Sequence, residues 1–325
     1  MVTETIIKTQ LKYALDKTDF KFGKKYEGKA RDNYILDGKM NGKRLIITTD
    51  RISAFDRVLC TIPFKGQVLN QISAFWFEKI KSIIKNHVIE VPDPNVMLVD
   101  ECKPYPVEMI VRGYITGVTT TSAWHNYEKG IRNFCGNVLP EGLKKNQKFE
   151  TPIITPSTKA EHGLHDESLS GGEIIKRGLV EEKTYKKMEK TALALFNFGS
   201  NFLAKQNLLL ADTKYEFGSL NGELILIDEI HTPDSSRFWI KDTYGELYSK
   251  GQEPQKLDKE YVRQWLLNKG FIGDGPIPNI PDEVKIEAAK RYITAYEMIT
   301  GNEFEAKNED ILKRIEKNLK YYVKP

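Results

Sequence analysis

The stretches Asp212-Thr-Lys-Tyr-Glu-Phe-Gly218 and Asp228-Glu-Ile-His-Thr-Pro-Asp-Ser-Ser-Arg237 place acidic and basic side chains among residues that favour β-strands. An ordinary core hairpin would bury Val, Ile or Phe at these positions. Carboxylates buried on a strand are unfavourable by several kcal/mol unless a cation or a proton compensates them. We therefore expect an antiparallel hairpin whose carboxylates bind a divalent metal that also holds phosphate oxygens.

The spacing of the charged residues predicts one shared ion. Asp212, Lys214 and Glu216 alternate, so they lie on one face of a strand. A three-residue loop over 220–222 would place Asp228 diagonally across from Glu216 on that face. A two-residue loop would place Asp228 on the opposite face, so the metal hypothesis predicts the longer loop. The alternative is a solvated face with surface ion pairs, but the apolar runs beside these residues place both strands in a core.

Length and composition indicate a globular protein of about two domains. The chain has 325 residues, of which 40% are hydrophobic and 29% are charged, and it carries a net charge of +4. This excess of positive charge is too small to indicate nucleic-acid binding, although it is compatible with drawing small anions into a cleft.

The cysteines and the apolar stretches exclude other classes of protein. Cys60, Cys102 and Cys135 show no CxxC spacing, so they indicate neither a disulfide framework nor a zinc site. The N-terminus shows no signal-peptide pattern, and the longest uncharged stretch, 191–204, suits a core helix rather than a membrane span. We expect a cytoplasmic protein without a membrane segment.

The N-terminal third is predicted to be rich in strands. Strands over 31–36 and 43–49 flank the hairpin signals of Asp37-Gly-Lys-Met-Asn-Gly42, and apolar residues at helical spacing predict a helix over 67–86. Prolines between 92 and 106 mark a connection that contains short strands. We place a boundary there, between a smaller lobe over 1–106 and a larger lobe over 107–325.

The larger lobe is predicted to begin with a strand over 107–115 and to contain a long polar loop over 136–170, which is usually a functional feature. Further helices are predicted over 181–206, 258–270 (capped by Asp258), 282–300 and 309–321. The predicted fold class is α+β, with antiparallel sheets, flanking helices and a helical C-terminal segment.

Two further motifs have the composition of anion sites. In Gly28-Lys-Ala-Arg-Asp32, glycine permits close approach of the backbone, and Lys29 and Arg31 add charge for nucleotide oxygens. Arg112 ends an apolar strand that starts at Glu108 and precedes Gly and hydroxyl residues. The alternatives are a surface loop for the first motif and, for Arg112, an arginine that only extends to solvent.

The segments Asp50-Arg-Ile-Ser-Ala-Phe-Asp56 and Thr158-Lys-Ala-Glu-His-Gly-Leu-His-Asp166 place polar side chains after extended residues, and each is a weak signal by itself. His162 and His165 lack a third nearby ligand, so we interpret them as loop residues. His231 is interpreted as a neighbour of the metal ligands and not as a ligand.

Together and in this order, the motifs resemble those of the phosphoribosylaminoimidazole-succinocarboxamide synthase (SAICAR synthetase) family, in its longer variety. The matching segments span residues 28–239. The resemblance implies a two-lobed fold similar to ATP-grasp and kinase-like enzymes, with the nucleotide between the lobes. It also implies a ligase of purine biosynthesis that joins L-aspartate to CAIR, a carboxylated aminoimidazole ribonucleotide, and converts ATP to ADP and phosphate.

The resemblance further implies roles for individual residues. The nucleotide positions are Gly28, Lys29, Arg31, Glu108 and Lys214, and the magnesium ligands are Glu216 and Asp228. The substrate positions are Ser53, Asp56, Arg112, Ser122, Lys159, Asp166, Asp212, Asp234, Ser236 and Arg237, of which Arg112 and Arg237 hold the phosphate of CAIR. The expected catalytic residues are Lys214, Arg31 and Asp212.

The chain departs from the short members of the family where residues 118–121 separate Gly117 from Ser122. Which hydroxyl of this segment contacts the phosphate is therefore open. The oligomeric state is open between a monomer and a homodimer.

The expected chemistry is conversion of the CAIR carboxylate by ATP to an acyl phosphate, which the amine of aspartate then attacks. Phosphoryl transfer needs positioning and charge neutralisation rather than a covalent nucleophile, which agrees with a sequence that shows no Ser-His-Asp or Cys-His arrangement. Two alternatives are another ATP-dependent enzyme, such as a small-molecule kinase, and a nucleotide- or RNA-binding module. Dispersed basic residues count against the second.

Overall fold

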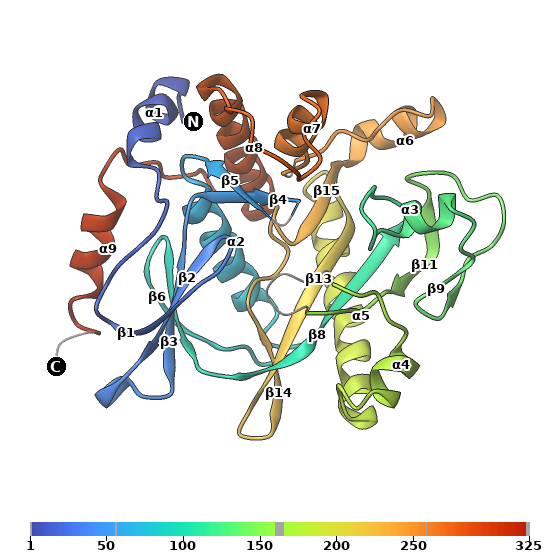
Figure 1. Ribbon diagram of the computed structural model, residues 1–325, viewed down its shortest axis with the longest axis horizontal. Coiled ribbons are helices and arrows are strands. Elements are labelled where there is room, and N and C mark those ends of the chain that lie inside the picture. The colour runs from blue at the N-terminus through green and yellow to red at the C-terminus, as the bar shows by residue number, and fades with distance from the viewer. Residues whose placement is uncertain (1, 56, 160–165, 258, 323–325) are drawn as a thin grey trace.

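The computed structural model describes residues 2–55, 57–159, 166–257 and 259–322, and Figure 1 shows two sheets side by side. The first is an antiparallel five-stranded sheet in the order β1-β2-β3-β7-β6. Its strands are β1 (Gly23–Glu27), β2 (Arg31–Leu36), β3 (Lys43–Thr48), β6 (Val88–Asp93) and β7 (Val96–Asp100). The strands predicted over 31–36 and 43–49 are confirmed, and the proline-marked connection carries β7.

The second sheet has six strands and contains the predicted hairpin. Its order is β11-β8-β13-β14, while β12 pairs with β8 and β15 pairs with β13. These strands are β8 (Lys103–Tyr114), β11 (Lys148–Ile154), β12 (Ser157–Thr158), β13 (Leu208–Leu220), β14 (Glu223–Ile227) and β15 (Ser236–Ile240). The prediction of a loop over 136–170 is wrong at residues 148–154, because these residues form β11, which pairs with β8.

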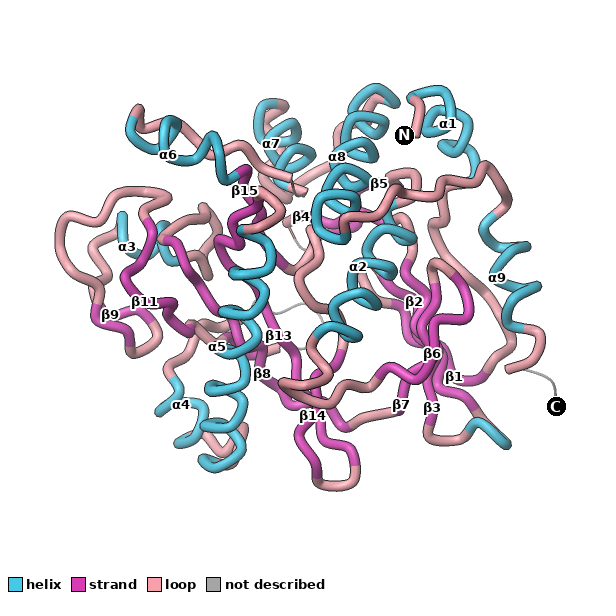
Figure 2. The backbone as a smooth tube through the Cα atoms, turned by 180° about the vertical axis from the view of Figure 1, so that it is seen from behind, coloured by secondary structure: helices cyan, strands magenta, loops and turns pink. Residues whose placement is uncertain are grey.

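Helices α2 and α5 lie behind the sheets (Figure 2) and, with α8, supply much of the main hydrophobic core. The helices are α1 (Glu4–Gln10), α2 (Lys65–Lys79), α3 (Ala123–Glu128), α4 (Gly171–Lys176), α5 (Glu182–Ala204), α6 (Lys241–Ser249), α7 (Glu260–Asn268), α8 (Asp282–Thr300) and α9 (Ile311–Leu319). The helices predicted over 181–206, 258–270, 282–300 and 309–321 are confirmed within a few residues. The capping residue predicted for α7, Asp258, lies outside the described residues.

Helix α2 ends earlier than the prediction of 67–86. Its last residues give way to a crossing toward β14, where Leu226 N–H donates to Lys85 O (3.0 Å) and His87 N–H donates to Leu226 O (3.2 Å). Ile80 and Ile84 are buried by this crossing. Their apolar spacing indicated a helix, and Ile84 N–H still donates to Ile80 O (3.2 Å) in one last turn. Beyond it, the backbone of Lys85 and His87 pairs with β14 instead of extending the helix.

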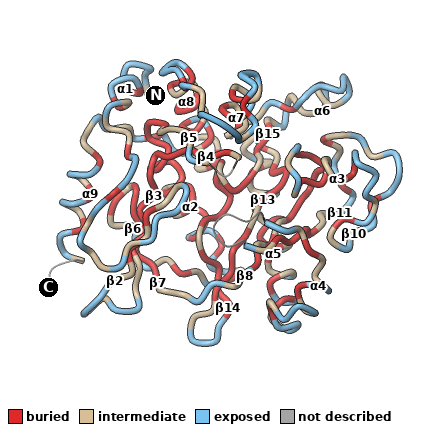
Figure 3. Tube along the Cα trace, in the orientation of Figure 1, coloured by how far each residue is buried: buried red, intermediate tan, exposed pale blue. Residues whose placement is uncertain are grey.

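Two small hairpins complete the described strands: β4 (Arg51–Ala54) with β5 (Arg57–Thr61), and β9 (Asn133–Phe134) with β10 (Asn137–Val138). The lobe boundary after residue 106 stays a prediction. The strands change sheets between Asp100 and Lys103, and α9 returns to pack on the first sheet. No helix among the described residues combines the length and apolar character needed to cross a membrane. Figure 3 shows that buried residues follow β8 and β13, whereas the turn after β13 is exposed.

Candidate active site

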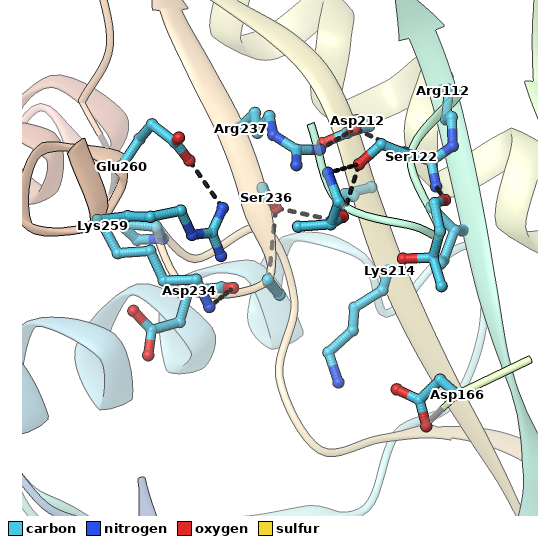
Figure 4. A pocket seen from close by; sticks show the side chains of 17 residues that line it. Arg112, Ser122, Asp166, Asp212, Lys214, Asp234, Ser236, Arg237, Lys259 and Glu260 are labelled. Atoms are coloured by element: carbon cyan, nitrogen blue, oxygen red, sulfur yellow. Dashed lines mark hydrogen bonds and ion pairs between the residues drawn. The ribbon is translucent and has the colours of Figure 1, made fainter. Parts of the chain in front are cut away.

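Two cavities flank β13. The first, the β13–α7 cavity, has a volume of about 310 Å³ and is lined by residues of β8, β13, β15 and α7 and by Ser122 (Figure 4). The second, the inter-sheet cavity, has a volume of about 190 Å³ and is lined by residues of both sheets, among them Asn33, Glu216 and Asp228. Lys214 lines the first cavity and Glu216 lines the second. The two cavities therefore meet at this pair of side chains.

The charged residues of β13 share one face, as predicted. Asp212 Oδ2 accepts from Arg112 Nη1 (2.9 Å) and from Arg237 Nη1 (2.5 Å). Lys214 Nζ donates to Glu108 Oε1 (2.8 Å) and to Glu216 Oε1 (2.7 Å). Lys159 forms a further ion pair with Glu216. Two groups of ion pairs thus lie along β13, one around Asp212 at the first cavity and one around Lys214 and Glu216 where the two cavities meet.

The predicted three-residue turn is wrong. Leu220 pairs with Glu223, so the loop is the two-residue Asn221-Gly222, and Glu216 pairs with Ile227. The expectation that Asp228 would then leave the metal face is also wrong, because β14 ends at Ile227 and Asp228 adopts a left-handed backbone (φ 69°). This conformation turns its side chain back to the inter-sheet cavity, where Glu216 also lies.

Electrostatics set the protonation of these groups. Burial lowers the pKa of Lys214, but the charges of Glu216 and Glu108 outweigh it and raise the pKa well above its ordinary value. Burial raises the pKa of Glu216, but Lys214 and Lys159 outweigh it and hold the pKa below its usual range. Burial raises the pKa of Asp228 to about 6; Arg31 opposes this shift and Glu216 adds to it. At neutral pH this site is a set of charged, paired groups.

The Gly28-Lys-Ala-Arg31 segment forms the turn between β1 and β2. Gly28 N–H donates to Arg31 O (2.7 Å) and closes the turn. Arg31 donates to Asp228 Oδ1 (3.0 Å) and forms an ion pair with Glu229 Oε2 (2.7 Å). The turn of the first sheet is therefore tied to the end of β14 in the second sheet.

Arg51 shapes this turn, and the sequence did not single it out. It is 3% exposed, and it donates to Gly28 O (2.9 Å) and Lys29 O (3.3 Å) while pairing with Asp32 (2.7 Å). Its neighbour Asp50 accepts from the backbone N–H groups of Leu15 and Gly66. The only sequence signal was their shared place in the segment 50–56.

Arg112, Ser122 and Arg237 gather at one end of the β13–α7 cavity (Figure 4). Arg112 is nearly buried and donates to Thr155 Oγ1, Asp212 Oδ2 and Thr121 O. Gly117 has φ 92°, and a Cβ at this position would lie 2.4 Å from Ser122 Oγ and 3.1 Å from Arg237 Nη2. A glycine is therefore required for this close approach. Ser236 also lines the cavity and donates to Thr213 Oγ1 (2.7 Å).

Asp234 lines the same cavity but is held by cations that the sequence analysis missed. Its carboxylate accepts from the fully buried Lys65 (2.7 Å) and from Tyr292 Oη (2.7 Å), and Lys259 donates to its backbone O (3.1 Å). Arg263, one turn beyond Lys259 on α7, lines the cavity and pairs with Glu260 (2.8 Å). The only sequence signal for Lys259 and Arg263 was their four-residue spacing on the predicted helix over 258–270.

The remaining predicted residues differ in placement. Asp166 lines the β13–α7 cavity, whereas Ser53 lies on β4 and is not among the lining residues. Asp56, His162 and His165 lie outside the described residues. The interpretation of His231 as a neighbour of the metal ligands is wrong. It is buried in the core with Nε2 2.6 Å from the Tyr215 hydroxyl, and burial lowers its pKa to about 3.

The acidic residues fit a magnesium ion that is shared with a nucleotide. Among the described residues, no three His, Cys, Asp or Glu side chains cluster as a complete metal site. Glu216 and Asp228 nevertheless line one cavity, and each is paired with cations instead of other acids. Mg²⁺ is commonly held by one or two carboxylates plus phosphate oxygens and water, so two protein ligands are sufficient.

Comparisons with known proteins agree with this geometry. The family model of SAICAR synthetase matches residues 24–274. A phosphoribosylaminoimidazole-succinocarboxamide synthase of Legionella pneumophila (strain Paris) is 47% identical over 294 residues, which cover 90% of this chain and 92% of that protein. The protein of the same name from Bacteroides thetaiotaomicron is 48% identical over 313 residues, which cover 94% and 98%.

Solved structures show the same fold. The SAICAR synthase of Saccharomyces cerevisiae, complexed with SAICAR, superposes with a TM-score of 0.78 at 33% identity and covers 90% of this chain and 100% of that chain. A type-2 SAICAR synthetase in complex with ADP gives a TM-score of 0.65 at 27% identity, with coverage of 87% and 100%.

Proposed function

The chain belongs to the SAICAR synthetase family, and from this premise we propose how its two cavities divide the reaction. The protein is an ATP-dependent ligase that joins L-aspartate to the carboxylate of CAIR and gives SAICAR, ADP and phosphate. The observation that carries the division of labour is the meeting of the two cavities at Lys214 and Glu216.

ATP occupies the inter-sheet cavity in this proposal. The turn Gly28–Arg31 lies beside this cavity, because Arg31 donates to Asp228, one of its lining residues. Its two cationic side chains would meet the phosphates, and Arg51 holds the carbonyls of Gly28 and Lys29. Glu108 lies behind Lys214 and orients its ammonium group. In this proposal the γ-phosphate lies at the end of the inter-sheet cavity formed by Glu216, next to Lys214 of the other cavity.

CAIR occupies the β13–α7 cavity. Arg237 and Arg112 mark the phosphate end because they bring two guanidinium groups to one wall, and Asp212 fixes both. Arg–phosphate contacts are among the strongest charge-assisted hydrogen bonds. The carboxylate of CAIR then points toward Lys214, with Lys159 and Asp166 near the junction and Asp234 on the facing wall.

Glu216 and Asp228 would hold Mg²⁺ at the junction. When bound, the ion supplies charge neutralisation for phosphate oxygens. The ion pairs of Glu216 with Lys214 and Lys159 keep this carboxylate ionised. The metal ion would therefore replace a lysine as the partner of a carboxylate that is already charged.

The γ-phosphoryl group leaves ADP and bonds to a carboxylate oxygen of CAIR, which gives an acyl phosphate. The neutral aspartate amine then attacks the acyl carbon, an amide C–N bond forms, and phosphate leaves with the former carboxylate oxygen and takes up the proton that the amine loses. Because the pKa of Lys214 is raised, its ammonium group stays charged and stabilises the transferring phosphoryl group rather than acting as a base.

The test is release of ADP with one substrate omitted at a time. ADP should form over repeated turnovers only when CAIR, aspartate, ATP and magnesium are all present, and SAICAR should accumulate in equal amount. One equivalent of ADP per enzyme without aspartate is compatible with a bound acyl phosphate. Repeated turnover of ATP with CAIR but without aspartate would indicate a kinase-like activity and would overturn the ligase assignment.

A further inference from the structure

Residues 118–121 form a loop whose two ends lie close together. We call these residues the threonine loop. Gly117 and Ser122 flank the loop and lie so close that a Cβ on Gly117 would meet Ser122 Oγ at 2.4 Å. A turn closes the loop internally, because Ser122 N–H donates to Thr119 O (2.8 Å). Arg112 Nη2 donates to Thr121 O (2.8 Å) and anchors its C-terminal side.

The hydroxyl of Ser122 is covered by this loop. Ser122 is 2% exposed, and its Oγ accepts from Thr119 N–H (3.2 Å) and lies 2.7 Å from Thr119 Oγ1. Both contacts come from the same residue, so the serine hydroxyl is occupied by the loop above it. Ser122, Thr119 and Thr121 all line the β13–α7 cavity, but of the two residues in this contact Thr119 is the more exposed, since it is half-buried.

At the arginine end of the cavity, the loop therefore covers the hydroxyl of Ser122 and offers the hydroxyl of Thr119 in its place. Arg112 already donates to three protein acceptors through Nε, Nη1 and Nη2. Arg237 shares its wall with Gly117, whose missing side chain leaves room for the guanidinium group. Thr119 Oγ1 can donate to a phosphate oxygen beside Arg237 while Ser122 holds it in place.

We propose that Thr119 is the hydroxyl that contacts the phosphate of CAIR, and that Ser122 is a positioning residue beneath it. This inference rests on the proposed function, which places a phosphate monoester at this end of the cavity. A hydroxyl donor to a charged oxygen is strengthened when Arg237 and Thr119 bind the same group.

The experiment measures dissociation constants for CAIR and for its phosphate-free nucleoside by titration calorimetry. Thr119→Val keeps the shape of the side chain and removes the hydroxyl, so it should weaken CAIR binding about tenfold and leave nucleoside binding within about twofold. Thr119→Ser should restore CAIR affinity. The matched control is Thr120→Val, because Thr120 is exposed on the same loop and only its backbone O accepts, from Asn126.

Ser122→Ala separates the two roles. If Ser122 only positions Thr119, Ser122→Ala should weaken CAIR binding by about threefold, and the double variant should match Thr119→Val alone. A larger effect of Ser122→Ala that adds to that of Thr119→Val would make Ser122 the phosphate contact and overturn the inference. Equal loss of CAIR and nucleoside binding in Thr119→Val would show that it only shapes the loop.

The proposed function and this inference fail in different ways. Wild-type protein that binds no CAIR would overturn both together. Normal wild-type ADP release, combined with equal CAIR affinity in Thr119→Val and Thr120→Val, would overturn the inference alone.

Discussion

The two faces of β13 are both buried, but they differ in chemistry. On the cavity face, Asp212 and Glu216 are 4% and 7% exposed and are held in ion pairs with residues of other elements. On the core face, Tyr215 and Phe217 are fully buried, and the Tyr215 hydroxyl meets the neutral ring of His231. One face of the strand thus carries charged side chains whose ion-pair partners can change, and the other face carries neutral side chains buried in the core.

This difference separates function from stability. Ion pairs at a cavity wall can exchange a protein cation for a metal or a substrate group at little cost. The groups of a buried neutral hydrogen bond have no such alternative partner, so loss of the bond lowers the free energy of unfolding. Substitutions on the cavity face should therefore change turnover, and substitutions on the core face should change the free energy of unfolding.

The largest effect is expected for Glu216→Gln. Loss of the carboxylate removes a proposed magnesium ligand and a partner of Lys214, so kcat should fall about 10³-fold. The free energy of unfolding should fall by no more than about 2 kcal/mol, because Lys214 keeps Glu108 as a partner. Steady-state kinetics at saturating substrates and thermal unfolding measure the two quantities.

Glu223→Gln is the matched control for this change. Glu223 lies on the same hairpin, but it is exposed and pairs with exposed Lys85. Its kcat should stay at the wild-type value. Near-normal turnover of Glu216→Gln at low magnesium would remove Glu216 from the metal site and would break the functional assignment of the cavity face.

The charged face of β13 was predictable from the sequence, whereas the path of Asp228 to the cavity was not. Alternation of Asp212, Lys214 and Glu216 is a local property of a strand and survives folding. The turn after Leu220 follows the local signal, because Asn-Gly favours a two-residue loop in which both residues have positive φ; the longer loop was expected only from the metal hypothesis. The left-handed backbone of Asp228 accompanies its contact with Arg31, which is 197 residues away in the chain.

Buried cations were missed for the same reason. Lys65 and Arg51 have no distinguishing local pattern, and each gains its role from partners that only the fold brings near, Asp234 for the first and the Gly28 turn for the second. The long helices α5 and α8 needed no such partners to be predicted, since the periodic spacing of their apolar residues lies within the segment itself.

The next largest effect is expected for Arg237→Ala, which tests the cavity face at its other end. Removal of the guanidinium group should raise KM for CAIR about 50-fold, because a charge-assisted contact to phosphate is lost. KM for ATP should stay within about twofold, since the nucleotide lies in the other cavity. Equal rises in both KM values would indicate a general disturbance of the site.

We expect the stability of the protein to fall in acid because of His231, which contacts the core face of β13 through Tyr215. Burial lowers its pKa from 6.5 to about 3, so below pH 6.5 the unfolded state takes up a proton that the folded state refuses. Stability is therefore lost as the pH falls, by about 2 kcal/mol at pH 5 for this residue. His231→Gln should flatten the dependence of the unfolding free energy on pH between about 7 and 5. An unchanged slope would mean that this ring does not titrate as its burial requires.

The smallest change, Tyr215→Phe, gives the sharpest contrast with Glu216→Gln because the two residues are adjacent on β13. It removes the hydroxyl that meets His231 Nε2 at 2.6 Å and leaves that buried nitrogen without its partner. The free energy of unfolding should fall by about 1–2 kcal/mol in urea titrations. Because Tyr215 lines neither cavity, kcat and both KM values should stay within about twofold. A large loss of turnover without loss of stability would mean that the core face takes part in catalysis, and the division between the two faces would fail.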